Sequence, residues 1–222
     1  MSLARFDSLI MSNRVASLSC IESSIGVPLI TLERNFLMPD PTITGTSAGE
    51  VIPGTAGPDV ISAGGGLDVV HGYDGDDTIT GGANRDRLYG DEGNDIVFGN
   101  GSEDKLWGGA GDDTVDGGDD DDRVYGGDGS DIVVGGDGND VLYGDSPDDG
   151  FDAEGFADIF RFDAADGSDK VFDFEHGIDK VELTSGGTYS LAYAGPNTIL
   201  TYGTTTVTFY DEVLDATDVV LI

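Results

Sequence analysis

A nine-residue repeat running from Gly45 to Tyr143 constrains this chain more than any other feature. The stretch holds eleven consecutive units of nine residues, and a twelfth begins at Gly144. The first position of each unit is glycine, with Ala63 as the exception, and the eighth position is always aliphatic. The sixth position is aspartate except in the first unit, which carries Glu50. A short fixed period means that each unit is one structural step, which buries its apolar side chain only by stacking on its neighbours.

The residue types predict how one unit folds. A three-residue strand such as 78–80 turns its middle side chain to one face and its two neighbours to the other. We expect the six residues before it, 72–77, to form a turn, because glycine supplies backbone conformations that other residues resist. Two strands and two turns then close one coil of eighteen residues, and the aliphatic eighth positions fill a thin core between two sheets.

Stacked coils place the sixth-position aspartates in two rows, one along each edge. Carboxylates packed that closely repel one another unless a cation lies between them. Calcium suits this gap better than magnesium, because it takes roughly six to eight oxygens in flexible geometry and accepts backbone carbonyls. The predicted metal ligands are the aspartates and glycines of the repeat, Asp59, Asp68, Asp77, Asp86, Asp95, Asp104, Asp113, Asp122, Asp131, Asp140 and Asp149 with Gly72, Gly81, Gly90, Gly108, Gly117, Gly126 and Gly135.

Two units, 126–134 and 135–143, match the pattern G-G-x-G-x-D-x-U-x at every defined position, where U is a large aliphatic residue. With these residues the repeat resembles the RTX nonapeptide family. The resemblance implies an all-β fold, a parallel β-roll that is a β-helix-like solenoid and binds several calcium ions. Asn84, Ser102 and Asp120 replace the fourth-position glycine, and we expect those turns to bind calcium weakly or to stay empty.

The charge of the chain agrees with a fold that depends on cations. The sequence has 44 Asp and Glu against 10 Lys and Arg, which gives a net charge of -34. Without metal such a chain is expected to be expanded, so that metal binding and folding form one equilibrium. Nucleic acid is excluded as a partner because its phosphates would be repelled. A disordered acidic linker would carry the same charge but has no reason to keep an aliphatic residue in every ninth position.

The two flanks of the repeat differ from it in composition. Residues 1–44 hold less glycine, and we interpret them as an N-terminal capping segment with a short helix over 3–15 and extended chain over 25–32. No apolar run in the chain qualifies as a secretory signal or spans a membrane. The single cysteine, Cys20, cannot form an internal disulfide and is interpreted as a small apolar residue.

Residues 45–152 are predicted to form the β-roll and 153–222 a C-terminal β cap, which protects the last coil. The predicted strands of the cap are 157–162, 169–174, 177–183, 189–193, 198–202 and 206–210. Their order resembles the segment that closes the rolls of serralysin-type proteases and the R-modules of mannuronan C5-epimerases. On this resemblance, Asp169, Asp173 and Asp179 are candidates for further calcium ligands.

The last nine residues, 214–222, join an acidic spacer to an apolar terminus. They resemble the uncleaved C-terminal signal of type I secretion substrates, and a last capping strand is compatible with that interpretation. The resemblance implies an extracellular protein, exported in one step by a type I system, that folds when it meets calcium.

One face of the predicted roll has a second pattern. Its outward ninth positions are aromatic or histidine, and three of its outward seventh positions are basic. The candidate ligand-binding face comprises Tyr89, Trp107, Tyr125, Arg87, Lys105 and Arg123. Three interpretations stay open: a surface for an acidic polysaccharide, a surface covered by a terminal segment or a partner subunit, and a common feature of such repeats without a ligand.

Catalytic motifs are missing from the sequence. It contains no H-E-x-x-H motif, and its two histidines, His71 and His176, fall in a repeat and a predicted turn. We therefore expect no enzyme. Two functional classes remain, namely a calcium-folded structural or interaction module, and a polysaccharide-binding module that works with or derives from a secreted enzyme.

Overall fold

The computed structural model describes residues 20–22, 28–30, 42–145 and 156–222. The chain divides into two compact units, Met1–Pro39 and Asp40–Ile222. Within Met1–Pro39, β1 (Cys20–Glu22) and β2 (Pro28–Ile30) pair as antiparallel strands. The expected helix over 3–15 lies outside the described residues, as does most of the expected N-terminal cap.

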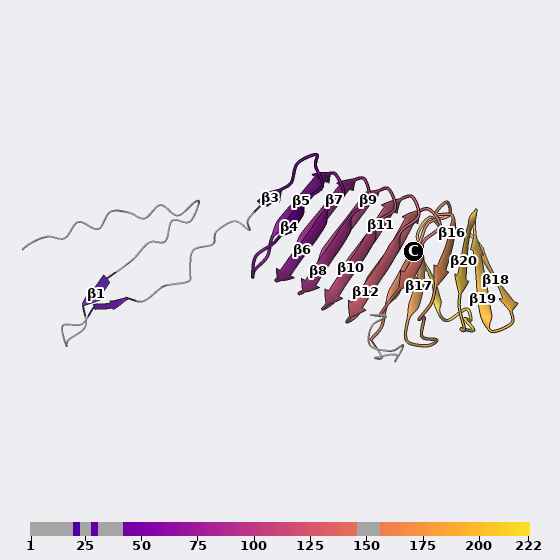
Figure 1. Ribbon diagram of the computed structural model, residues 1–222. Coiled ribbons are helices and arrows are strands. Elements are labelled where there is room, and N and C mark those ends of the chain that lie inside the picture. The colour runs from indigo at the N-terminus through magenta and orange to yellow at the C-terminus, as the bar shows by residue number, and fades with distance from the viewer. Residues whose placement is uncertain (1–19, 23–27, 31–41, 146–155) are drawn as a thin grey trace, which may run out of the picture. The chain divides into compact units, whose positions relative to one another are not determined.

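The compact unit Asp40–Ile222 is a solenoid of two mainly parallel sheets. The part of the chain that the structure describes contains no helix. Sheet 1 has nine strands (Figure 1): β3 (Thr42–Thr44), β5 (Val60–Gly65), β7 (Thr78–Ala83), β9 (Ile96–Gly101), β11 (Thr114–Asp119), β13 (Ile132–Asp137), β15 (Ile159–Phe162), β17 (Lys180–Leu183) and β21 (Val219–Leu221). Sheet 2 has ten strands: β4 (Val51–Pro53), β6 (Val69–Asp74), β8 (Arg87–Glu92), β10 (Lys105–Ala110), β12 (Arg123–Asp128), β14 (Val141–Tyr143), β16 (Ser168–Val171), β20 (Thr205–Phe209), β19 (Asn197–Tyr202) and β18 (Tyr189–Ala194).

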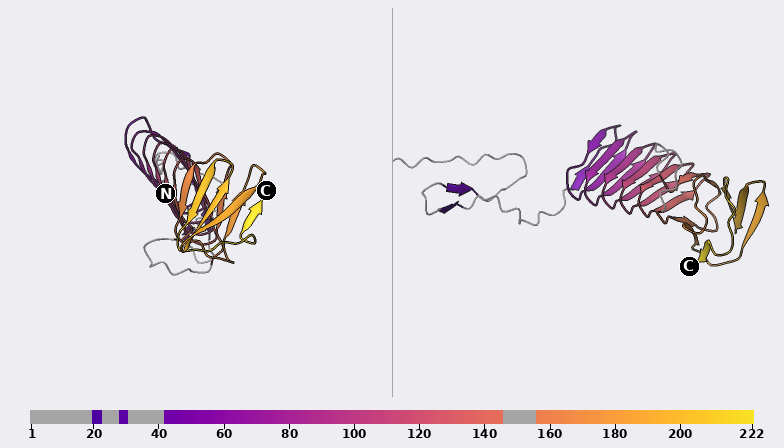
Figure 2. Two further views of the ribbon diagram at one scale, coloured as in Figure 1. Left: turned by 90° about the vertical axis from the view of Figure 1, so that its right-hand side faces the viewer. Right: turned by 90° about the horizontal axis from the view of Figure 1, so that it is seen from below.

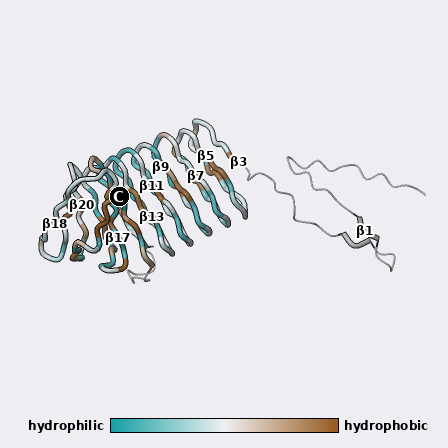
Figure 3. The backbone as a smooth tube through the Cα atoms, turned by 180° about the vertical axis from the view of Figure 1, so that it is seen from behind, coloured by the Kyte–Doolittle hydropathy of each residue, from teal (hydrophilic) through white to brown (hydrophobic). Residues whose placement is uncertain are grey.

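Successive coils stack in the register that the repeat predicts. Ile61 of β5 pairs with Ile79 of β7, which pairs with Val97 of β9, and each step is eighteen residues. The aliphatic eighth positions are buried throughout and form one core between the sheets. Figure 2 shows the strands of successive coils lying side by side. In Figure 3 hydrophobic residues recur along the strands, whereas hydrophilic residues follow the turns.

The expectation of three-residue strands separated by six-residue turns is wrong for most of the roll. The strands β5 to β13 are each six residues long. The glycine-rich positions that open each unit continue the ladder, because Gly64 pairs with Gly82 and Gly65 pairs with Ala83. Gly64 and Gly82 pair although their φ values are positive, at 95° and 116°, so the residues left to each turn are fewer than the expected six.

The C-terminal region continues both sheets after the nine-residue period ends. β15 pairs with β13, and β16 pairs with β14, so the roll gains further coils. β20 adds to β16 in parallel, and the antiparallel meander of β18, β19 and β20 then extends sheet 2. β21 pairs with β17 and closes sheet 1. In the described residues, no helix is long and apolar enough to cross a membrane.

Candidate metal sites along the two turn edges

Two rows of buried aspartates run along the roll, one at each edge where a turn enters a strand. Row 1 enters sheet 1 and consists of Asp59, Asp77, Asp95, Asp113, Asp131, Asp158 and Asp179. Row 2 enters sheet 2 and consists of Asp68, Asp86, Asp104, Asp122, Asp140 and Asp169. Every member is at most 2% exposed. Aspartate is rarely buried so completely unless its carboxylate has a partner.

One carboxylate oxygen in each row member beyond the first has a backbone partner. The N–H of each aspartate donates to Oδ1 of the next aspartate in its row, at 2.6 to 3.0 Å. The N–H of Glu50 starts row 2 in the same way, by donating to Oδ1 of Asp68 at 2.7 Å. The sixth-position side chain therefore joins two consecutive coils, and this bond needs only one of its two oxygens.

Among the residues that the structure describes, the second carboxylate oxygen has no hydrogen-bond partner in most of these side chains. The Oδ2 atoms that are buried without a hydrogen bond belong to Asp68, Asp77, Asp86, Asp95, Asp104, Asp113, Asp122, Asp131, Asp140 and Asp169. An anionic oxygen that is buried and unpaired is costly, and proteins normally pair such a charge or coordinate it to a metal. Ten such oxygens in two regular rows indicate a repeated ligand rather than ten separate defects.

The electrostatic cost appears in the pKa values of the rows. Burial raises the pKa of Asp77, Asp86 and Asp95 from 3.8 to about 6. Burial raises the pKa further toward the C-terminal end, to about 8 for Asp122 and Asp131. In each case the backbone hydrogen bond lowers the pKa but does not offset the desolvation. A cation beside Oδ2 would reverse this effect, because it favours the ionised carboxylate.

The first-position glycines line the space beside these unpaired oxygens. A Cβ built on Gly108 would lie closer than 3.0 Å to Oδ2 of Asp113 and to the carbonyl oxygen of Gly126. The same crowding by one carboxylate and one carbonyl oxygen occurs at Gly72, Gly90, Gly99, Gly117 and Gly126. None of these glycines has a positive φ. Glycine is therefore needed here for space, because two oxygens converge where a side chain would begin.

The donor set fits calcium. No group of three or more His, Cys, Asp or Glu side chains is placed to hold a metal within the described ranges. Each site instead combines an aspartate oxygen with a backbone carbonyl oxygen, and hard cations such as calcium accept such oxygens readily. Softer transition metals prefer imidazole or thiolate ligands. Calcium would be held by Oδ2 of the aspartates and by carbonyls of the first-position glycines, and its charge would neutralise the rows.

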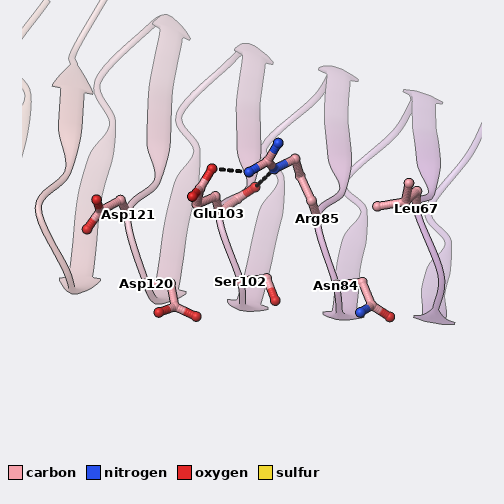
Figure 4. A pocket seen from close by; sticks show the side chains of 7 residues that line it. All are labelled: Leu67, Asn84, Arg85, Ser102, Glu103, Asp120 and Asp121. Atoms are coloured by element: carbon pink, nitrogen blue, oxygen red, sulfur yellow. Dashed lines mark hydrogen bonds and ion pairs between the residues drawn. The ribbon is translucent and has the colours of Figure 1, made fainter.

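The two turn edges differ at the fourth position of the repeat. On the row 1 edge this position is always glycine, at Gly57, Gly75, Gly93, Gly111 and Gly129. On the row 2 edge, Asn84, Ser102 and Asp120 hold φ values of 79°, 84° and 77°, which favour glycine. Figure 4 shows these three side chains along a pocket of about 520 Å³, with Arg85 and Glu103 forming an ion pair beside them. Asp86, Asp104 and Asp122 keep an unpaired oxygen despite these replacements.

The structure places the predicted aspartate ligands that it describes in the two rows, and it adds two further candidate ligands. Asp149 lies outside the described residues, and the other ten aspartates lie in the two rows. Asp158 was not predicted, although it continues row 1 by accepting the N–H of Asp131 at 2.8 Å. Asp158-Ile159-Phe160 keeps the repeat's order of aspartate, outward residue and core residue, which is the signal that could have found it. The carbonyl oxygen of Gly99 is the second addition, because it lies beside the space next to Gly81.

The other candidate capping ligands have different surroundings. Asp169 continues row 2 and has an unpaired Oδ2. Asp173 accepts the N–H groups of Gly144 and Asp145. Asp179 accepts the N–H of Asp158 on one oxygen and that of Glu175 on the other. Of these three candidates, only Asp169 therefore presents the arrangement that is seen along the roll.

The aromatic face forms a continuous stack of rings. His71, Tyr89, Trp107, Tyr125, Tyr143, Phe172 and Tyr210 stack in that order, with ring centroids 4.5 to 5.3 Å apart. The interplanar angles are 4° to 14°. The predicted alignment of Tyr89, Trp107 and Tyr125 on neighbouring strands is confirmed. Phe172 and Tyr210 extend the stack into the cap beyond the predicted set.

This stacking changes the interpretation of the face. Each interior ring has both of its π faces against another ring, so its edge remains for a ligand. Of the three interpretations, a surface for a sugar polymer would therefore use the ring edges in the interior of the row, because the π faces there are occupied by neighbouring rings. Arg87, Lys105 and Arg123 do align beside the rings on β8, β10 and β12. These three cations form no ion pair within 4.0 Å among the described residues.

Comparison with known proteins identifies the repeat. The family model described as RTX calcium-binding nonapeptide repeat (4 copies) matches residues 44–79, 53–88, 71–106, 89–124, 98–133 and 125–160. These overlapping matches together cover more than half of the 222 residues. No curated protein matches the sequence.

Two solved structures resemble the fold at low sequence identity. The crystal structure of the extracellular lipase LipA from Serratia marcescens shares 18% identity, with a TM-score of 0.30. That match covers 80% of this chain, and this chain spans 40% of the lipase structure. The solution structure of the AlgE6R3 subunit from the Azotobacter vinelandii mannuronan C5-epimerase shares 19% identity, with a TM-score of 0.23. It is matched over 79% of this chain and 80% of its own length.

Proposed function

Because the chain belongs to the RTX calcium-binding nonapeptide repeat family, we propose that it is a non-enzymatic structural or interaction module that folds on binding calcium outside the cell. The observation that carries this proposal is the two rows of buried carboxylate oxygens without a partner. Calcium supplies the positive charge that balances these carboxylate oxygens, so folding and calcium binding become one equilibrium.

The sites suit an environment that is rich in calcium. Calcium affinity depends on the number of charged ligands and on the rigidity of the site, and extracellular modules bind with Kd values of about 10⁻⁴ to 10⁻³ M. A site that combines one carboxylate oxygen with a backbone carbonyl oxygen has little ligand charge and belongs at the weak end of that scale. The chain would stay expanded where calcium is scarce and fold after export. The resemblance of residues 214–222 to a type I secretion signal supports the same route.

Calcium titration of the chelated full chain tests this proposal. Circular dichroism should show little β structure without calcium and a cooperative gain of β structure at calcium concentrations near 1 mM, of the order expected for extracellular sites. Magnesium at the same concentration should restore much less, because it demands a stricter geometry and keeps its water. A compact β-rich protein in chelator would contradict the proposal.

Export is tested separately, because β21 has a place in the fold. Val219 packs against the core and β21 pairs with β17, so deleting the terminus would damage the cap as well as any signal. Val220 and Ile222 are 38% and 57% exposed. Changing both to serine should abolish export through a type I transporter and leave the calcium content of the refolded protein unchanged. Normal export of this variant would remove the terminus from the proposal.

A second candidate function is binding of an acidic polysaccharide. The observation in its favour is the row of Arg87, Lys105 and Arg123. Three adjacent like charges that have no carboxylate partner among the described residues form an anion-attracting strip on an acidic protein. In this candidate function the three cations bind the polymer, and the edges of the aromatic rings lie beside the bound polymer. Changing Lys105 to Gln should then weaken binding of a polyuronate, and that weakening should disappear at high salt. A neutral glucan should bind neither the wild type nor the Lys105→Gln variant, because it carries no charge for these cations to attract.

A further inference from the structure

The C-terminal end of sheet 2 is unlike the rest of the molecule in charge. Residues 183–210 contain no Asp, Glu, Lys or Arg, although these four types make up 24% of the chain. This stretch includes all of β18, β19 and β20. Elsewhere the net charge of -34 opposes the approach of a second copy. Within these three strands two copies can meet without bringing carboxylates together.

The outermost strand of this end is an unprotected edge. Among the described residues, the backbone of β18 pairs with β19 alone, and it does so without a bulge. Every second residue of an antiparallel strand turns its N–H and C=O away from that partner. Natural edge strands are usually protected by charge, proline or a bulge. The sequence of β18, Tyr-Ser-Leu-Ala-Tyr-Ala, contains none of these features.

The apolar layer of the core reaches this edge and is not fully covered there. Leu200 and Tyr202 on β19 are 0% and 1% exposed. On the same face of β18, Tyr189 and Leu191 are only partly buried against the core, and Tyr193 is 60% exposed. The core therefore ends in a partly open apolar rim, directly beside the free backbone groups of β18.

We propose that β18 pairs antiparallel with β18 of a second copy of this chain, across a two-fold axis at Leu191. The order Tyr-x-Leu-x-Tyr is symmetric about Leu191, so each chain presents the same surface to the other. In this register Leu191 faces its own copy, and Tyr189 faces Tyr193 of the partner subunit. Cross-strand aromatic and aliphatic pairs of this kind stabilise antiparallel sheets.

The opposite face of the strand and the neighbouring surface fit the same arrangement. Ser190 faces Ala192 of the partner subunit, and both side chains are small and uncharged. A pocket of about 410 Å³ at the start of β18 is lined by Gly186, Gly187, Thr188 and Tyr189, among other uncharged residues. It lies where the register brings Tyr193 of the partner subunit. Because one strand pair buries little area, the dimer should be reversible.

Sedimentation of the calcium-loaded full chain over a range of concentrations tests the pairing. The wild type should form a dimer that dissociates on dilution. Ala192→Lys should weaken the dimer at least tenfold, because the two new lysines become diagonal neighbours across the axis. This loss would occur although lysine lowers the net negative charge. The matched control is Ala83→Lys, an exposed alanine on β7 of sheet 1, which lies outside the proposed interface and should leave the dimer unchanged.

The register has its own readout by cross-linking in a Cys20→Ser background. Leu191→Cys should form an intermolecular disulfide on oxidation, because residue 191 faces itself. Ala194→Cys should not, since the two copies of residue 194 would lie about 20 Å apart along the strands. Circular dichroism in calcium checks that each variant is folded. A wild type that stays monomeric, a dimer that survives Ala192→Lys, or equal cross-linking at both positions would overturn the proposal.

Discussion

The backbone N–H of Asp104 donates a hydrogen bond of 2.6 Å to Oδ1 of Asp122, eighteen residues further along the chain. The same carboxylate has its Oδ2 buried without a partner. One oxygen therefore fixes the spacing of two coils, and the other is held beside the first-position Gly117 with nothing to balance its charge. This division of the carboxylate links the stability of the fold to a cation.

Changing Asp122 to Asn separates the two roles of the carboxylate. The amide oxygen can still accept the N–H of Asp104, but the anionic oxygen is lost. In calcium we expect fewer bound ions and a free energy of unfolding lower by about 1–3 kcal/mol. Without calcium the change should not destabilise the fold, because a neutral side chain avoids the desolvation cost. Chemical denaturation with and without calcium measures both effects, and Asp119→Asn at an exposed position is the control. An equal loss in the free energy of unfolding with and without calcium would contradict this account.

Changing Gly108 to Ala tests the space reserved for the cation. The new Cβ would lie closer than 3.0 Å to oxygens of Asp113 and Gly126. We expect a loss of about 1–3 kcal/mol in stability, as for other overpacked sites, together with weaker calcium binding. Gly101→Ala is a matched control, because a Cβ there has no atom within 4 Å and its φ is not positive. If both variants bind calcium as the wild type does, the first-position glycines do not shape the sites.

Acid should partly replace calcium. In the folded chain, burial raises the pKa of Asp104 and Asp113 to about 7 and that of Asp122 and Asp131 to about 8, from 3.8. A raised pKa means that the folded state binds more protons, so its stability contribution is full below pH 3.8 and is lost as the pH rises through 7 to 8. Circular dichroism of calcium-free protein should show β structure increasing from pH 8 to pH 4. A calcium-free protein that is equally unfolded across this range would contradict the predicted sign.

The aromatic stack should contribute to stability rather than to calcium binding. Trp107 stacks on Tyr89 at 4.5 Å and on Tyr125 at 5.3 Å. Removing two such contacts in Trp107→Ala should cost about 1–3 kcal/mol, from about 0.5–1.5 kcal/mol for each pair. Phe98→Ala is the matched control, because Phe98 holds the same outward position on sheet 1 without a stacked neighbour among the described residues. Equal midpoints for the two variants in thermal unfolding with calcium would exclude a structural role for the stack.

The sequence repeat was enough to predict the two sheets, the register and the buried aliphatic core. It also predicted which aspartates stack, because an eighteen-residue coil leaves no other arrangement. It could not predict the six-residue strands, since glycine composition signals a turn even where Gly64 and Gly82 pair across coils. The sequence also could not predict that most of these carboxylates accept a backbone N–H on only one oxygen, because this depends on the backbone direction of the neighbouring coil.

The cap shows where periodic reasoning ends. Asp158 keeps the nine-residue period, but it lies 27 residues from its partner Asp131 and so joins row 1, whereas coils of eighteen residues would place it in row 2. Asp169 lies 29 residues from its partner Asp140 and falls off the period altogether. Phe172 and Tyr210 continue the aromatic stack for the same reason, through strand pairing rather than sequence spacing. The alternating strands of the meander were predicted, but the addition of β20 to β16 in parallel was not.

The location of bound calcium tests the central claim most directly. Crystals of the full chain grown in calcium should give anomalous scattering peaks in two rows, one along each turn edge. Each peak should lie about 2.3–2.6 Å from an aspartate Oδ2 such as that of Asp113, which is the usual calcium–oxygen distance. A folded β-roll whose anomalous peaks are absent from both rows, or lie only at exposed side chains, would contradict the account.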